Sequence, residues 1–106
     1  MFGVSKGGIS AFRIASLHPD LFHSLTVLPG WPKSADEKRL HKILGIAVNF
    51  LVGEKDSRWR KKSEYFSAHL TNLGGDVVLE IFPEAGHTAF QTFPLPHLMD
   101  LMIRHK

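Results

Sequence analysis

A run of seven residues, 46–52, constrains the fold of this chain more than any other stretch. All of its side chains are apolar except that of Asn49. A strand with one face in water alternates apolar and polar residues, whereas a nearly continuous apolar run is typical of a strand covered on both faces in a parallel sheet. The run therefore predicts the buried strand of a parallel sheet with helices on both faces.

The segments around this run alternate between strand and helix patterns. Further strands are predicted at 24–28 and 77–82, and helices at 8–17, 58–73 and from 96 onward. Ser34 with Glu37 three residues later forms a capping box, which predicts a helix from 34 to a stop at Gly45. Regular alternation of this kind predicts an α/β fold in a single domain, residues 1–106.

The first residues carry a pattern with chemical meaning, because Gly3, Ser5 and Gly7 form G-x-S-x-G. Where a strand turns directly into a helix, this pattern places the serine on a tight, strained corner. We expect a Cβ at either flanking glycine to clash, so Gly7→Val should damage folding. The corner would expose the Ser5 hydroxyl and leave the Lys6 N–H free to stabilise an oxyanion. Taken alone, the pattern also fits an ordinary turn at a helix start.

The loops after two predicted strands carry an acid and a histidine. Asp56 follows the strand at 46–52, and His87 follows the strand at 77–82. Because ligands of open α/β sheets bind outside the carboxyl ends of the strands, we expect Ser5, Asp56 and His87 at one edge. An imidazole can take the serine proton, and a carboxylate behind it fixes the tautomer and stabilises the imidazolium. The spacing therefore suits nucleophilic catalysis.

With these pieces the sequence resembles the α/β-hydrolase family, and most of all its small esterase and prolyl-oligopeptidase-like branches. The resemblance covers essentially the whole chain and rests on residues 3–8, 18–22, 52–56 and 85–87. It implies Ser5 as the nucleophile, Asp56 as the acid and His87 as the base of a triad. The Lys6 backbone N–H would be one oxyanion donor. The implied activity is cleavage of carboxylic esters, or of small amides or peptides, without a cofactor.

The resemblance is to the C-terminal half of such an enzyme. Family members have several strands before the elbow, including the one that leads into the serine, and an early loop that supplies a second oxyanion donor. Here only Met1 and Phe2 precede Gly3. A partial fold lacking those N-terminal strands would leave a sheet edge exposed, and exposed edges invite self-association. The alternative function is therefore a truncated, catalytically weak or inactive hydrolase fragment that serves as an assembly or binding module.

Several of these residues also have a structural explanation. Asp56 could simply cap the helix that follows it, and Glu54 competes for the acid role. Trp31 could line a substrate pocket or close over the core. The basic run at 58–62 fits a solvated helix face better than a nucleic-acid contact.

Composition narrows the remaining function classes. There is no cysteine, so disulfides and thiolate nucleophiles are excluded, and no metal-ligand spacing such as H-E-x-x-H occurs. No stretch approaches the ~20 apolar residues of a membrane span, and the N-terminus lacks a signal-peptide layout. We therefore expect no metal, no nucleic-acid partner, no membrane span and a cytoplasmic location.

Overall fold

The computed structural model describes residues 1–83, 86 and 95–104. The strands are β1 (Phe2–Gly3), β2 (Ser24–Val27), β3 (Ala47–Gly53) and β4 (Asp76–Phe82). The helices are α1 (Lys6–Leu17), α2 (Ser34–Glu37), α3 (Ser57–Asn72) and α4 (Leu95–Met102), with 3-10 turns η1 (Pro19–Leu21) and η2 (Leu40–Ile43). Among these described helices, none combines the length and apolar character needed to cross a bilayer.

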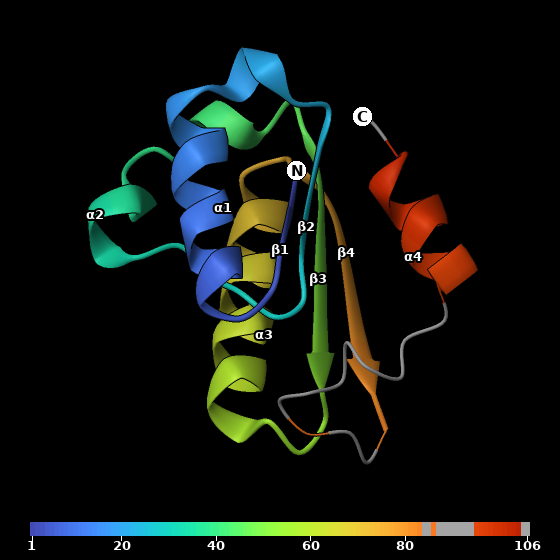
Figure 1. The fold of residues 1–106 in the computed structure, drawn as a ribbon. Helices are drawn as coiled ribbons and strands as arrows, with labels where there is room; N and C mark the ends of the chain where they lie inside the picture. Colours follow the sequence, from blue (N-terminus) through green and yellow to red (C-terminus); the bar gives the residue numbers. More distant parts are fainter. Residues whose placement is uncertain (84–85, 87–94, 105–106) are drawn as a thin grey trace.

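The four strands form one parallel sheet in the order β1-β2-β3-β4. In Figure 1, α1 and α3 lie on one side of this sheet and α4 on the other. Strand β3 is buried over its whole length, as expected of a strand covered on both faces. The predicted α/β fold with a parallel sheet and helices on both faces is confirmed. The outer strands in this order are β1 and β4, and self-association through an edge stays a prediction.

Two buried clusters explain why β3 is apolar on both sides. Val48 and Phe50 point into the larger cluster, which α1 and α3 complete with Phe12, Phe66 and Leu70. Leu51 points the other way, into a smaller cluster with Leu28 of the loop after β2 and Leu101 of α4. Because successive side chains of a strand face opposite sides, both faces of β3 need apolar residues. Burial of this area drives the layers together.

Asn49, the polar exception in β3, ties α4 to the sheet. Its fully buried side-chain amide donates to the Thr26 hydroxyl at 3.0 Å and to the Leu101 carbonyl at 2.9 Å. The Arg104 guanidinium donates to the Asn49 side-chain oxygen at 3.0 Å and to the Asp76 carboxylate at 2.8 Å. A buried polar group is tolerated when its hydrogen bonds are satisfied in this way. The network joins β2, β3, β4 and the end of α4.

Replacing Asn49 with leucine is expected to lower the free energy of unfolding by about 2–3 kcal/mol, because the Leu101 carbonyl and the Arg104 guanidinium each lose one of their hydrogen bonds in the buried network. The matched control is Asn72→Leu, at the exposed end of α3, which should change stability by less than about 0.5 kcal/mol. Urea denaturation measures both. Equal stability of the two variants would show that the network contributes nothing.

The prediction of one continuous helix from residue 34 to Gly45 is wrong. Helix α2 ends at Glu37, and a separate 3-10 turn, η2, follows it. The N-cap residue of α2 is Lys33, with no side-chain capping bond, so Ser34 is the first helical residue and the capping box is absent.

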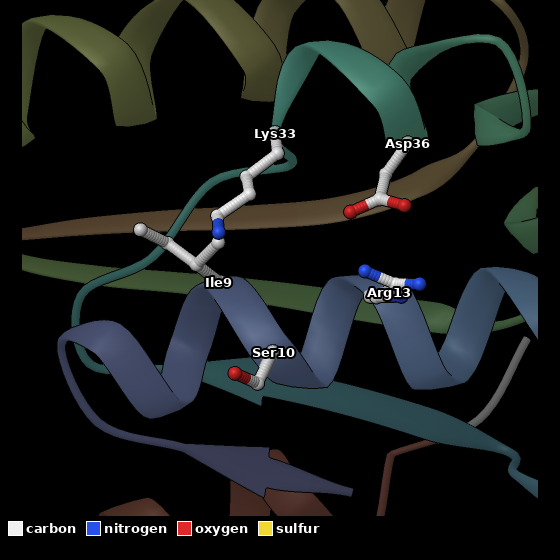
Figure 2. A pocket seen from close by; sticks show the side chains of 5 residues that line it. All are labelled: Ile9, Ser10, Arg13, Lys33 and Asp36. Atoms are coloured by element: carbon white, nitrogen blue, oxygen red, sulfur yellow. The ribbon is translucent and has the colours of Figure 1, made fainter.

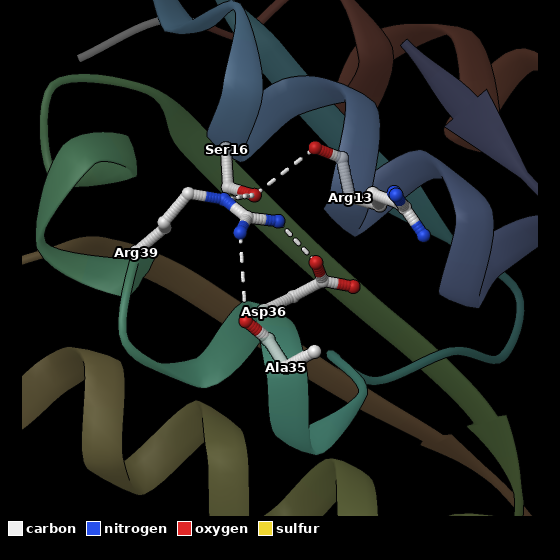
Figure 3. A network of polar contacts seen from close by, with 5 residues as sticks. All are labelled: Arg13, Ser16, Ala35, Asp36 and Arg39. Atoms are coloured by element: carbon white, nitrogen blue, oxygen red, sulfur yellow. Dashed lines mark hydrogen bonds and ion pairs between the residues drawn. The ribbon is translucent and has the colours of Figure 1, made fainter.

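A polar contact with α1 accounts for this break. The Arg39 guanidinium, between α2 and η2, pairs with the Asp36 carboxylate and donates to the Ser16 hydroxyl of α1 at 3.2 Å (Figure 3). These bonds hold the segment against α1, and Leu40 and Ile43 then enter the core from η2. Tertiary contacts therefore override the local helix signal.

Candidate active site

Ser5 stands at the corner between β1 and α1, with φ 56° and ψ −120°. Among the described residues it is the one non-glycine residue with positive φ. Side-chain-bearing residues rarely occupy this region, and holding one there costs on the order of 1–3 kcal/mol. The strained corner predicted from the G-x-S-x-G pattern is present, and the role of Ser5 as nucleophile stays a prediction.

The strand that leads into the serine is present, contrary to expectation, as the two residues of β1. Phe2 pairs with Thr26 and Gly3 with Val27 in parallel register. The Leu28 N–H extends this pairing by donating to the Gly3 carbonyl at 2.9 Å. The corner is therefore anchored to the sheet on its strand side.

The glycines around the corner differ in how closely other atoms approach them, whereas the sequence predicted crowding at both Gly3 and Gly7. A Cβ on Gly3 would lie 2.3 Å from the Gly7 carbonyl oxygen, so the expected clash holds there. A Cβ on Gly7 would meet no atom of the described residues within 4 Å outside its own helix turn, so the clash expected there, the reason given for Gly7→Val to damage folding, is absent. Gly7 is exposed on the first turn of α1, whereas Gly8 faces inward, where a Cβ would lie 2.4 Å from the Pro29 carbonyl oxygen. The pattern missed Gly8 because it does not encode the approach of α1 to the loop after β2.

Lys6 is the first residue of α1 and follows Ser5 directly. The next two backbone amides already donate hydrogen bonds. The Gly7 N–H donates to the Val4 carbonyl and the Gly8 N–H to the Ser5 carbonyl, both at 2.8 Å. For the Lys6 N–H, the described part of the chain provides no backbone acceptor. An amide of this kind at a helix N-terminus can stabilise negative charge.

Asp56 lies three residues beyond the end of β3, at the N-cap position of α3. Its side chain makes no capping hydrogen bond with that helix, so capping does not explain the aspartate. The half-buried Asp56 and Ser5 both follow strands whose carboxyl ends share one edge of the sheet (Figure 1). Glu54, the competing acid, is exposed, and its backbone N–H donates to the Phe82 carbonyl at 2.8 Å.

His87 lies outside the described residues, so its position relative to Ser5 and Asp56 stays a prediction. Its preceding strand, β4, ends at Phe82, which pairs with Gly53 at the carboxyl edge of the sheet. Within the described segments, no three His, Asp or Glu side chains gather closely enough to hold a metal ion.

Trp31 packs against the larger core cluster and against Trp59 of α3, with 4.1 Å between the ring centroids. The Arg58 guanidinium lies over the Trp31 ring, 5.9 Å from its centroid. Trp31 therefore helps to close the core, and a role in a substrate pocket stays a prediction. In the same basic run, Arg60 forms an ion pair with Glu64 at 3.5 Å along the exposed face of α3.

Ser5→Gly is expected to raise the free energy of unfolding by about 1 kcal/mol relative to Ser5→Ala. Glycine adopts φ 56° without strain, whereas alanine keeps the Cβ and the strain. Urea denaturation of the two variants tests this. A glycine variant that is no more stable than the alanine variant would show that the corner stores no strain.

Comparison with known proteins supports the fold assignment. No protein-family model matches the sequence, and no curated protein matches it. The structure is similar to the crystal structure of a thermostable esterase, with a TM-score of 0.77 and 16% sequence identity over 99% of this chain. At this identity the likeness shows the fold alone, an esterase-like α/β fold. The chain spans 30% of the length of that esterase.

Proposed function

We propose that this chain carries the catalytic residues of a serine hydrolase that cleaves carboxylic esters, or small amides or peptides. The observation that carries the proposal is the strained backbone of Ser5 at the carboxyl edge of the sheet. Strain at a non-glycine residue persists only where the surroundings hold it, and it gathers at active sites. The esterase-like fold agrees with this assignment.

In the proposed reaction, the Ser5 Oγ attacks the ester carbonyl while His87 takes the hydroxyl proton. The Lys6 N–H donates to the oxyanion that forms. His87 then gives the proton to the departing alcohol, which leaves an acyl group on Ser5. A water molecule, deprotonated by His87, releases the acid and restores the serine. Asp56 holds the imidazole in the tautomer that accepts the proton and stabilises the imidazolium.

Two further features support this assignment. The Asp56 side chain makes no capping bond to α3, so helix capping, the structural alternative raised from the sequence, does not account for this residue. The match to a limited part of an esterase fits the proposal that residues 1–106 are the C-terminal portion of a larger α/β-hydrolase domain, which would supply further substrate contacts.

Covalent labelling with a neutral alkyl fluorophosphonate tests the proposal. We expect a single adduct, mapped by peptide mass spectrometry to Ser5, and unchanged labelling in the control Ser34→Ala, which replaces an exposed serine of α2. An adduct on a different serine would remove Ser5 as the nucleophile. The absence of labelling in the folded chain would favour the non-catalytic assembly or binding module.

A further inference from the structure

A groove runs along α1 on the side that faces α2 (Figure 2). Its main part has a volume of about 420 Å³ and is lined by Lys6, Ile9, Ser10 and Lys33. An adjoining hollow of about 80 Å³ shares Ile9, Ser10 and Lys33 and adds Arg13 and Asp36. We call these two hollows together the α1–α2 groove.

The groove is positively charged. Lys6, Arg13 and Lys33 are exposed, and within the described residues none of them takes part in an ion pair. Asp36 is the one acidic side chain among the lining residues, and it is 2% exposed and already paired with Arg39 (Figure 3). Its charge is therefore largely neutralised, and the cations dominate.

The groove begins beside the proposed nucleophile. Lys6 follows Ser5 directly, and Lys33 lies in the segment that leaves the carboxyl end of β2. The approach of α1 to this segment is close, since a Cβ on Gly8 would lie 3.0 Å from the Gly30 Cα. Backbone packing therefore fixes the separation between α1 and the segment that carries Lys33, and the groove extends from the residue next to Ser5.

Resting on the proposed function, we infer that the α1–α2 groove binds an anionic group of the ester substrate, a carboxylate or a phosphate. Ammonium and guanidinium groups are the usual partners of such anions. The half-buried Ile9 offers an apolar surface to the carbon chain that links the anion to the ester. The hydrolase therefore prefers esters that carry a negative charge away from the reacting carbonyl.

Paired esters test this preference at low ionic strength. On the acyl side the pair is mono-4-nitrophenyl succinate and its uncharged counterpart 4-nitrophenyl 4-methylpentanoate. On the alcohol side it is 4-acetoxybenzoate and 4-isopropylphenyl acetate. In one of the two pairs, Lys33→Gln should lower kcat/KM for the charged ester about fivefold and leave the neutral ester unchanged. The side that responds identifies where the substrate carries its anion.

The control is Lys38→Gln, which removes the same charge from an exposed site outside the groove and should leave both pairs unchanged. The inference would be overturned if Lys33→Gln changed kcat/KM equally for the charged and the neutral ester in both the acyl-side and the alcohol-side pair. Turnover of the neutral esters would, in that case, still support the proposed function. The preference should also weaken as salt is added, because exposed charges are screened.

A binding measurement separates the groove from the chemistry. Inorganic phosphate is titrated into Ser5→Ala, and the amide signals of the groove residues are followed by NMR. We expect saturable binding that weakens about fivefold when Lys33→Gln is added. Phosphate binding that is absent, or equal with and without Lys33→Gln, overturns the groove assignment. Failure of the wild type to hydrolyse any neutral ester would instead overturn the proposed function.

Discussion

Ser5→Ala is expected to lower kcat/KM for a neutral ester by at least about a thousandfold. The variant keeps the backbone and the Cβ of the corner, so α1 and the sheet should fold as before, and only the attacking oxygen is lost. Turnover of 4-nitrophenyl acetate measures the loss, and circular dichroism checks that the fold is kept.

The control for this variant is Ser34→Ala, which removes an exposed hydroxyl at the start of α2 and should leave turnover unchanged. A folded Ser5→Ala that retains a tenth or more of the wild-type rate would remove Ser5 from the reaction. Under that result the strained corner would have a structural purpose only.

Gly3→Ala should destabilise the fold by about 3 kcal/mol or more. The added Cβ would lie 2.3 Å from the Gly7 carbonyl oxygen and 2.7 Å from the Gly8 Cα, and these backbone atoms cannot turn away as a side chain can. Overpacking usually costs about 1–3 kcal/mol, and a clash with backbone belongs at the upper end. A domain of this kind is stable by only about 5–15 kcal/mol, so urea denaturation should detect the loss easily.

Gly7→Ala is the matched control, because it adds the same methyl group at the other glycine of the pattern, four residues further along and at an exposed position of α1. It should be as stable as the wild type or more stable by up to about 1 kcal/mol, since alanine favours a helix more than glycine does. Equal destabilisation by the two variants would contradict the described packing of the corner.

The layered fold was predictable from the sequence because the signals for strands and helices were local. The apolar run around Phe50 needs two covered faces, and the small residues Ala11 and Ala15 of α1 pack closely on the sheet. Where a long-range contact decides the structure, the local signal failed. The Arg39 contact with Ser16 breaks the helix expected after Ser34.

The candidate site was predictable in part. The pattern around Ser5 implies a strained corner in any strand-to-helix turn, and the structure has it. The pattern could not show which glycine is crowded, because the crowding at Gly8 comes from Pro29 and Gly30, about twenty residues further along the chain. The groove next to Lys6 was missed for the same reason. Arg13 and Lys33 line one hollow only because β2 pairs with β1 and thereby brings the segment after β2 alongside α1.

The most direct test of the account asks whether Asp56 acts through His87. The measurement is the loss of kcat/KM caused by Asp56→Ala, determined once in the wild type and once in His87→Ala. The account predicts a loss of about a hundredfold or more in the wild type and almost none when His87 is already replaced, because members of one catalytic unit are not additive. The same loss in both backgrounds, or a larger loss from Glu54→Ala, would contradict the assigned triad.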